Sequence, residues 1–429
     1  MRAWPGISAV VVTASVVLAG CGTEPQTTEP TAQPSRSSSQ TTAEHPAGAA
    51  ELTPVTVEVP EGLDDAPLDQ PRQALVPDGW TLEVVARVPK ARMAAWAPDG
   101  ALLVSVPSTG EVLKVLPTQS TLLDGLDQPH GLFFAGPTLY VAESDQIDAY
   151  DYADGAAVNR RTVIDGLPDA KSPDLRGAYA HAHALKSVVV GDDGAVYFSI
   201  GSTGNISAED RTADPPRATI MRVPPGGGPA EPFATGVRNG TGLAFAPDGS
   251  LWTAVNNRDN VADPDGRVVQ SYVDDHPPES VARLTPGREL GWPYCNPDGP
   301  PPAKLIRDLQ TNPDGAEMDC AALHPIEQTL GAHSAPLGMS FAELPQPFGQ
   351  GALVGVHGSW NRDAPRAPEV SFFAWRDGTL GPQQTLVGGF QDDDGQRWGR
   401  PVAAVTGPDG AVYITDDFAG AVYRLAPPP

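Results

Sequence analysis

The stretch "GDDGAVYFSI", residues 191–200, decides the fold. Its Asp-Gly pair supplies the positive φ angles of a tight hairpin turn, and the alternating apolar residues after the turn indicate a strand. Variants recur along the chain as "APDGALLVSV" at 97–106, "FAGPTLYVAE" at 134–143, "APDGSLWTAV" at 246–255, "FGQGALVGVH" at 348–357 and "GPDGAVYITD" at 407–416. The chain therefore repeats one hairpin unit.

A second strand is predicted after each copy. These strands are "GEVLKVL" at 110–116, "QIDAYDY" at 146–152, "TIMRV" at 219–223, "SVARL" at 280–284, "EVSFFAW" at 369–375 and "AVYRL" at 421–425. Several units are spaced by about fifty residues, which is in the range of propeller blades. We predict an all-β fold, a six-bladed β-propeller, which hides its sheet edges by radial repetition. A large β-sandwich is the alternative, but a sandwich needs no repeating unit.

Composition agrees with many short strands. The chain has 429 residues, with 45 glycines and 47 prolines, a content that suits strands joined by tight turns and not a helical protein. A longer gap between the fourth and fifth units, about 285–345, holds Cys295 and Cys320. In an exported protein such a pair is typical of a disulfide, and two buried free thiols are the alternative.

The N-terminus has the pattern of an export signal. "MRAWPGISAVVVTASVVLAGC" has Arg2 at its start and an apolar run that is too short to span a membrane. "LAGC" resembles a bacterial lipobox, and an ordinary signal with an incidental cysteine is the alternative. We predict a signal peptide at 1–20, a lipidated Cys21 with a disordered Pro/Thr/Ser-rich tether at 21–70, and the propeller at 71–429. The expected location is the outer face of a bacterial cell membrane.

Charge and missing motifs exclude several functions. The formal net charge is −25 and no basic tract is present, so nucleic acid is not an expected partner. The sequence has no GxGxxG, Walker loop, HExxH or CxxCH, which disfavours a nicotinamide, nucleotide or haem enzyme. In so acidic a protein, arginines in loops entering the channel suggest a bound anion.

Polar clusters beside the strands are the candidate site, because a propeller works where strand ends and loops converge on its channel. "HAHALK" at 181–186 offers His183 as a general base, or simply as a loop residue. Arg238 could polarise a carbonyl or bridge two blades. "NNRDN" at 256–260 has the oxygen ligands that calcium takes, although turn chemistry would also explain it. "HGSWNR" at 357–362 offers a tryptophan wall.

The order of these motifs resembles a known family. "RNGTGLAF", "NNRDN", "ELGWPYC", "HSAPLG", "HGSWNR", "WGRPV" and "TDDFAG" follow one another as in the glucose/sorbosone dehydrogenase family, whose members are six-bladed propellers that use pyrroloquinoline quinone. The resemblance covers about 72–427 and is closer to the sorbosone and pyranose dehydrogenase branch. It implies that pyrroloquinoline quinone and Ca²⁺ are cofactors and that a sugar or aldose is the substrate.

The resemblance also implies roles for individual residues. It makes His183 and Arg238 catalytic, and it gives calcium the main-chain carbonyls of Asn257 and Arg258. The residues expected to contact the cofactor are Lys186, Arg238, Asn239, His333, Arg400 and Asp416. Three positions depart from the family pattern: Lys186 stands where an arginine is common, Thr203 where the glucose branch has a glutamine, and Trp398 where that branch has an arginine.

The implied reaction is the oxidation of a sugar. His183 would take the proton from a hydroxyl group while hydride passes to the quinone, and Arg238 would stabilise the negative charge that grows on the quinone oxygen. Calcium would polarise the quinone carbonyl. The electron acceptor is unknown, and the membrane is a partner through Cys21. The alternatives are a calcium-dependent lactone hydrolase of the gluconolactonase type and a cofactor-free propeller that serves as a binding module.

Overall fold

The computed structural model describes residues 51–169, 171–172, 183–392 and 394–428, and nearly all of its regular structure is β-strand. The predicted signal peptide, Cys21 and the tether up to residue 50 lie outside these residues. Within the described ranges, no helix has both the length and the apolar character to cross a membrane.

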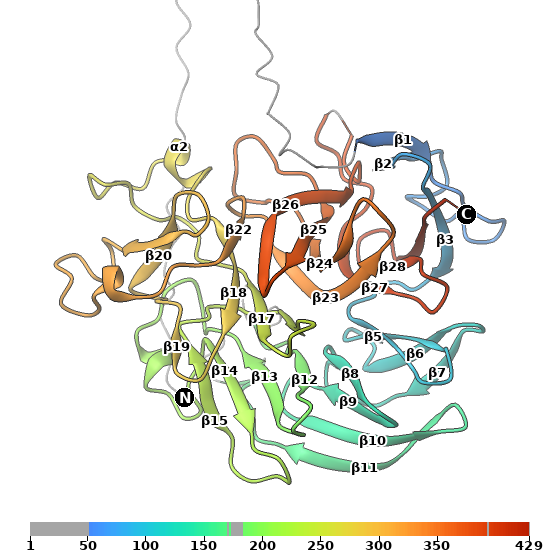
Figure 1. Cartoon of the computed structure of the whole chain (residues 1–429), viewed down its shortest axis with the longest axis horizontal. Coiled ribbons are helices and arrows are strands. Elements are labelled where there is room, and N and C mark those ends of the chain that lie inside the picture. The colour runs from blue at the N-terminus through green and yellow to red at the C-terminus, as the bar shows by residue number, and fades with distance from the viewer. Residues whose placement is uncertain (1–50, 170, 173–182, 393, 429) are drawn as a thin grey trace, which may run out of the picture. The chain divides into compact units, whose positions relative to one another are not determined.

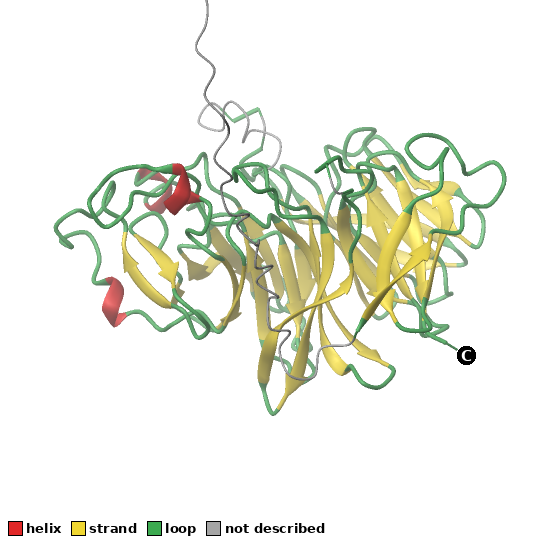
Figure 2. Cartoon of the chain, turned by 90° about the horizontal axis from the view of Figure 1, so that it is seen from above, coloured by secondary structure: helices red, strands yellow, loops and turns green. Residues whose placement is uncertain are grey.

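Six sheets of the described residues are arranged around a common axis (Figures 1 and 2), which confirms the predicted six-bladed β-propeller. The first sheet contains β4 (Ala94–Trp96), β5 (Leu102–Val106), β6 (Glu111–Leu116) and β7 (Ser120–Leu123). The second contains β8 (Leu132–Ala135), β9 (Thr138–Ala142), β10 (Ile147–Ala153) and β11 (Ala156–Ile164). The third contains β12 (Val188–Val190), β13 (Val196–Ile200), β14 (Thr219–Val223), β15 (Glu231–Thr235) and the added strand β19 (Arg288–Glu289).

The remaining three sheets follow the same plan. The fourth contains β16 (Gly242–Phe245), β17 (Leu251–Val255), β18 (Glu279–Leu284) and β22 (Gln328–Leu330). The fifth contains β23 (Pro336–Leu344), β24 (Gly349–Val356), β25 (Glu369–Arg376) and β26 (Thr379–Val387). The sixth contains β27 (Pro401–Thr406), β28 (Val412–Asp416), β29 (Ala421–Ala426) and β3 (Thr81–Arg87). Because β3 pairs with β29, an early strand of the chain completes the last blade.

The predicted Asp-Gly turns connect the first two strands of four blades. Their glycines have positive φ angles, 82° at Gly194 and 79° at Gly410, for example. The preceding aspartate accepts a hydrogen bond from the backbone two residues on, as Asp193 does from the N–H of Ala195 at 3.0 Å. Only a residue without a side chain adopts this backbone at no steric cost, so the motif fixes where each hairpin turns.

Separate apolar clusters hold neighbouring blades together. Leu103 of β5 and Leu139 of β9 belong to the cluster between the first and second blades, and Trp252 of β17 and Phe373 of β25 to the one between the fourth and fifth. All four side chains are at most 1% exposed. Each sheet buries both faces, which explains why the strands are rich in large apolar residues.

The folded part begins earlier than predicted. β1 (Leu52–Thr56) pairs antiparallel with β2 (Gln73–Pro77), and Val57 and Leu68 are buried in the core of the last two blades. The prediction of a disordered tether up to residue 70 is therefore wrong for residues 51–70. Prolines and acidic residues hide the strand pattern of "LTPVTVEV" at 52–59, which covers a blade instead of forming one.

The insertion lies between the third and fourth strands of the fourth blade, and it ends before β22, earlier than predicted. It contains β20 (Cys295–Asp298), β21 (Lys304–Arg307) and the short helix η2 (Cys320–Ala322). The predicted disulfide between Cys295 and Cys320 is confirmed, with the two Cα atoms 5.7 Å apart. Two other short helical segments, η1 (Glu209–Arg211) and α2 (Gln270–Val273), lie in loops of the third and fourth blades.

Candidate active site

A polar cavity of about 490 Å³ opens where the innermost strands begin. Its walls come from the segments just before β4, β12, β16, β23 and β27 and from the loops after β17, β24 and β28. Of the residues predicted from the sequence, the cavity contains His183, Arg238, Asn239, Asn257, His333 and Arg400. Residues far apart in the chain thus meet at one end of the channel, as a propeller requires.

His183 is buried in this cavity, 5% exposed, on the segment that leads into β12. Its Nδ1 lies 2.9 Å from the carbonyl oxygen and 3.0 Å from the hydroxyl oxygen of Ser202. A carbonyl only accepts, so Nδ1 carries the proton and the lone pair is on Nε2. Burial, assisted by the positive charge of Arg238, lowers the pKa of His183 to about 3. The imidazole is therefore neutral at pH 7 and can act as a base.

Arg238 is also buried and holds the loop after β17. It donates to the carbonyl oxygen of Asn257 at 2.7 Å and to Oδ1 of Asn205 at 3.3 Å, and it lies 3.6 Å from Oδ2 of Asp259. Oδ1 of Asn205 also accepts from the N–H of Asp259 at 2.7 Å. The arginine and the asparagine together fix the course of the "NNRDN" loop.

Two carboxylates, Asp259 of the "NNRDN" motif and Glu279 of β18, line the same wall. Oδ1 of Asp259 lies 3.1 Å from Nδ1 of His333, whose Nε2 lies 2.7 Å from the carbonyl of Val273. Burial opposes the charged imidazolium, but these two acceptors outweigh it and raise the pKa of His333. Burial raises the pKa of Glu279 to about 8. The wall is therefore rich in oxygen atoms suited to a hard cation.

Arg258 points away from the cavity. Its guanidinium, 1% exposed, donates to Asp308 at 2.5 Å and to Gln310 at 2.5 Å, both in the insertion. Oδ2 of Asp308 also accepts from Asn296, the neighbour of the disulfide-bonded Cys295. The side chain of Arg258 thus attaches the cavity loop to the insertion.

A second charged group in the cavity is centred on Asp417, just after β28. It accepts from Arg92 at 2.8 Å and from Nε of Arg400 at 2.7 Å, and Nε2 of His357 lies 3.5 Å away. Burial alone would raise the pKa of Asp417, but the nearby cationic and imidazole groups outweigh it and lower the pKa to about 2. Asp417 therefore orients the two arginines that face the cavity.

Asp416, predicted to lie beside the cofactor, does not line the cavity, whereas the next residue, Asp417, does. Its side chain, fully buried, accepts from the N–H groups of Arg400, Phe418 and Ala419 at 2.8 Å and from the hydroxyl of Tyr423 at 3.2 Å. Successive residues at a strand end point in opposite directions, so Asp416 closes the turn while Asp417 enters the cavity.

We expect Asp416→Asn to lower the free energy of unfolding by about 1–3 kcal/mol, because an amide NH₂ would face backbone donors and leave them unsatisfied. Urea denaturation measures this, with Asp69→Asn, at an exposed position, as the matched control. Unchanged stability together with lost cofactor binding would instead restore the direct role predicted for Asp416.

Lys186, Thr203 and Trp398 do not line the cavity either, although a cofactor contact is predicted for Lys186. Its buried ammonium donates to the carbonyls of Ser144, Pro168 and Ala184 at 2.5, 2.6 and 2.8 Å. Thr203 donates to Asp210 at 2.7 Å, and Trp398 donates to the carbonyl of Gly389 at 2.7 Å inside the core. All three positions therefore serve the scaffold.

Comparison with known proteins identifies the family. The TrAA12-like family model matches residues 74–427. The chain belongs to the TrAA12-like family. This confirms the predicted membership of a glucose/sorbosone dehydrogenase-like family.

Two curated proteins are similar in sequence to part of this TrAA12-like chain. A pyrroloquinoline quinone-dependent pyranose dehydrogenase of Coprinopsis cinerea is 25% identical over 333 residues, which are 64% of this chain and 42% of that protein. An uncharacterized protein of Borreliella burgdorferi is 26% identical over 230 residues, 52% of this chain and 56% of that protein. The chain therefore spans about half the length of these curated relatives.

Solved structures share the fold of this TrAA12-like chain. The holo form of the pyranose dehydrogenase PQQ domain of Coprinopsis cinerea superposes with a TM-score of 0.69 at 20% identity, over 86% of this chain and 98% of that one. A calcium structure of a Trichoderma reesei carbohydrate-active enzyme of family AA12 gives 0.67 at 19% identity, over 82% and 96%. The PQQ-bound aldose sugar dehydrogenase of Streptomyces coelicolor gives 0.52 at 14% identity, over 82% and 100%.

Proposed function

We propose that the protein is a pyrroloquinoline quinone-dependent dehydrogenase that oxidises a sugar or aldose. The observation that carries the proposal is the juxtaposition of neutral His183 with Arg238 in a cavity that also has Arg92 and Arg400. This oxidation needs a base and a cationic group that can stabilise a growing negative charge. It also needs further cations to bind an anionic cofactor.

The cavity residues fit such a cofactor. Pyrroloquinoline quinone has three carboxylates and an ortho-quinone, and it would supply the hydride-accepting carbon. Asp417 holds Arg92 and Arg400, and Asp259 holds Arg238. The cavity therefore offers two separate groups of positive charge to an anionic, planar molecule. The exposed ring of Trp360, at the cavity mouth, offers a wall for the sugar.

His183 would act at a defined atom. Ser202 holds the proton on Nδ1, so Nε2 would accept the proton of the sugar hydroxyl as hydride leaves the carbon that bears this hydroxyl. Arg238, fixed by the Asn257 carbonyl and by Asn205, would stay in place as charge develops nearby. Water exclusion by the surrounding buried residues strengthens both effects.

Calcium would be held on the wall of Asp259 and Glu279. Two carboxylates and the carbonyls of loop 256–258 form the set of oxygen ligands that Ca²⁺ prefers. The carbonyl of Asn257 already accepts from Arg238, so the carboxylates carry most of the charge compensation. This extends the predicted ligand set, which named only the carbonyls of Asn257 and Arg258.

We expect Glu279→Gln to weaken Ca²⁺ binding about tenfold or more, because the buried carboxyl group, whose pKa is about 8 in the apoprotein, can ionise as it binds the cation, whereas an amide cannot. Calorimetric titration of the apoprotein with Ca²⁺ measures this. Glu111→Gln, on β6 and away from the cavity, should bind Ca²⁺ as the unmodified protein does. Equal affinities of the Glu279 variant and its control would remove Glu279 from the site.

The proposed function is tested by reconstitution. Purified apoprotein is titrated with pyrroloquinoline quinone in the presence of Ca²⁺ while the visible spectrum of the cofactor is followed. A panel of aldoses is then added with a dye as electron acceptor. Saturable binding and sugar-dependent dye reduction are expected. Absence of binding with Ca²⁺ present would contradict the proposal.

A calcium-dependent lactone hydrolase is the second candidate, and one observation favours it. Such an enzyme needs carboxylates converging on its metal, and Asp259 and Glu279 lie on one wall. The arginines of the cavity have no evident use in that reaction. Lactone hydrolysis with Ca²⁺ alone, in the absence of any quinone, would support this candidate against the dehydrogenase.

A further inference from the structure

A second hollow, of about 430 Å³, occupies the central channel behind the polar cavity. Its walls are the six innermost strands, β4, β8, β12, β16, β23 and β27, from every blade. Residues just before these strands line the polar cavity, and the strands themselves line the channel. Just before β4, for example, Arg92 lines the cavity and the next residue, Met93, lines the channel. The two hollows therefore lie one behind the other along the axis.

One layer of side chains separates them. Met93, Leu337, Val402 and Ala403 pack into a single small cluster. Leu337 lines the polar cavity, whereas Met93 and Ala403 line the channel. These apolar side chains are all that lies between the two linings at this point.

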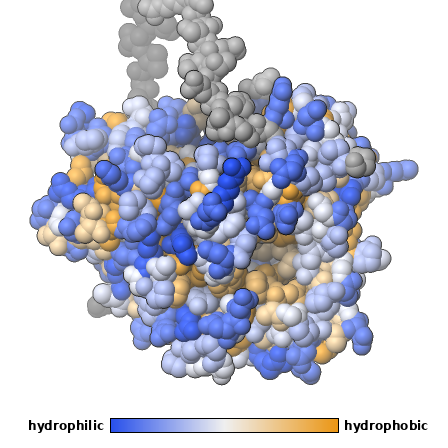
Figure 3. Space-filling model, viewed as in Figure 1, coloured by the Kyte–Doolittle hydropathy of each residue, from blue (hydrophilic) through white to orange (hydrophobic). Residues whose placement is uncertain are grey.

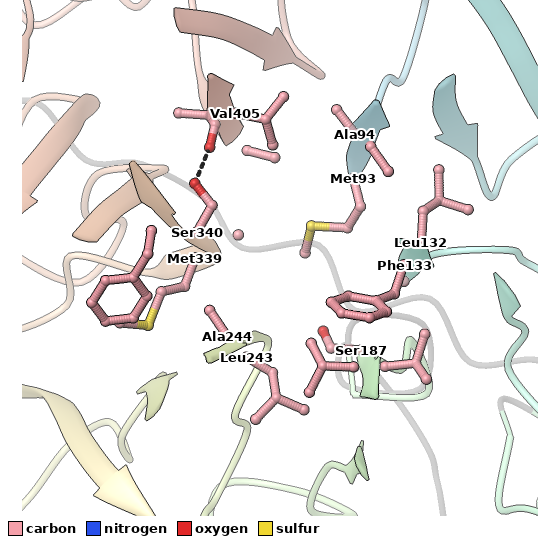
Figure 4. Close-up of a pocket in the computed structure, with 18 of the residues that line it drawn as sticks. Met93, Ala94, Leu132, Phe133, Ser187, Leu243, Ala244, Met339, Ser340 and Val405 are labelled. Atoms are coloured by element: carbon pink, nitrogen blue, oxygen red, sulfur yellow. Dashed lines mark hydrogen bonds between the residues drawn. The ribbon is translucent and has the colours of Figure 1, made fainter. Parts of the chain in front are cut away.

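The lining of the channel selects neutral ligands. Among the described residues that form it, none has a charged or titratable side chain. Figure 4 shows Met93, Phe133, Leu243 and Met339 arranged around the hollow. In Figure 3, apolar residues are visible in the middle of the face, inside a mostly hydrophilic rim. A charged molecule would lose its hydration there without gaining a counter-charge.

Hydrogen-bond donors remain for a ligand that has carbonyl groups. The hydroxyl of Ser340 is used internally, donating to the carbonyl of Ala404 at 2.6 Å (Figure 4). The indole Nε1 of Trp96, which lines the channel, is buried and has no hydrogen-bond partner in the described part of the chain. The innermost strands are also sheet edges, which present unpaired main-chain N–H groups.

We propose that this channel binds a neutral, lipophilic quinone that serves as the electron acceptor. The inference rests on the proposed dehydrogenase function and names its missing partner. Oxidation of a sugar hydroxyl to the carbonyl level releases two electrons and two protons, and reduction of a quinone to its hydroquinone takes up both. The electrons cross the layer of Met93 and Leu337, and the protons come from solvent at the channel mouth. Such carriers dissolve in membranes, beside which the predicted lipid on Cys21 would hold the protein.

Methionine oxidation tests the site in the apoprotein. Met93 and Met339 line the channel, while Met318 lies on the insertion and serves as an internal reference. Dilute hydrogen peroxide converts exposed methionines to sulfoxides, which mass spectrometry quantifies for each peptide. Duroquinone, a neutral and fully substituted quinone, should slow the oxidation of Met93 and Met339 several-fold and leave Met318 unchanged. A sulfonated naphthoquinone, which is anionic, should protect neither.

Several outcomes would overturn the proposal. One is that duroquinone leaves the oxidation of Met93 and Met339 unchanged, and another is that it slows that of Met318 equally. A third is that the sulfonated quinone protects Met93 and Met339 as well as duroquinone does. Ala94→Phe, which fills the channel, should abolish protection, whereas Ala157→Phe, at a half-buried alanine on the outer strand β11, should not. The protection of the methionines is measured without cofactor, so its result does not depend on the dehydrogenase activity.

The electron-acceptor role is tested in the reconstituted enzyme. Sugar-dependent formation of durohydroquinone is compared with the turnover that is linked to ferricyanide, a charged acceptor. Ala94→Phe should lower the ratio of the first rate to the second by about tenfold or more, because the quinone no longer fits in the filled channel. An unchanged ratio would refute the role of the channel, even where sugar oxidation itself is normal.

Discussion

Replacing His183 with alanine is expected to lower kcat/KM for the sugar by about 10²–10⁴-fold, the usual contribution of a general base. The affinity for pyrroloquinoline quinone should change little, because Arg92, Arg238 and Arg400 supply the charge that holds it. Steady-state kinetics and spectroscopic titration measure the two quantities. His324→Ala, at an exposed histidine of the insertion, is the matched control and should behave as the unmodified protein.

The pH dependence gives an independent test of this residue. Burial and Arg238 lower the pKa of His183 to about 3, so the basic form already dominates at pH 5. The pH profile of kcat/KM should therefore show no acid limb near the ordinary histidine pKa of about 6.5. An acid limb at about pH 6.5 that disappears in the alanine variant would contradict this prediction, because it would mean that the imidazole of His183 is solvated.

The largest effect on stability is expected at Arg258. Arg258→Met would leave the carboxylate of Asp308 buried without its counter-charge, at a cost of about 3–5 kcal/mol. Both side chains are 1% exposed, so solvent cannot compensate. The free energy of unfolding, measured in urea, should show this loss.

A double variant separates charge from packing. In Arg258→Met/Asp308→Asn, the remaining side chain is neutral and can still accept from the N–H groups of Gln310 and Thr311. The double variant should therefore be more stable than Arg258→Met alone. If it is equally unstable, the loss arises from the packing of the arginine and the ion pair contributes little.

The repeats made the fold predictable. Each Asp-Gly turn with its following strand was found as a hairpin of one blade, because turn chemistry and period-two alternation are local properties. The strand at 52–56 was missed because it copies no repeat unit and pairs with a segment outside the blades. Local patterns find repeated elements, and they miss elements that only cover them.

The site was predicted less completely, and the misses have a common cause. Lys186 and Asp416 have the right residue types in the right segments, but their side chains point into the scaffold. Arg92 points into the cavity and was missed, and Asp417 of the "TDDFAG" motif points there in place of the selected Asp416. Neighbouring residues at a strand end differ in direction, which composition does not report. Arg92 could have been found, since Arg238 and Arg400 also stand just before an innermost strand.

Glu279 was missed for another reason. It lies at the start of a third strand, β18, in the polar stretch "VDDHPPES" at 273–280, where the sequence does not distinguish it from the neighbouring Asp274 and Asp275. Its place in the cavity depends on how the loop after β17 folds back, with the N–H of Asn257 donating to it at 2.5 Å. That contact joins residues 22 apart and has no local signature.

The pairing of β3 with β29 sets an order of events during synthesis. The ring is closed by residues 81–87 and 421–426, so the other five blades can form before β29 is synthesised, while the sixth must wait for that strand. Until then β3 lacks its partner β29, and the ring is open at the sixth blade. A chain truncated before β29 would therefore lose the strand pairing that closes the ring.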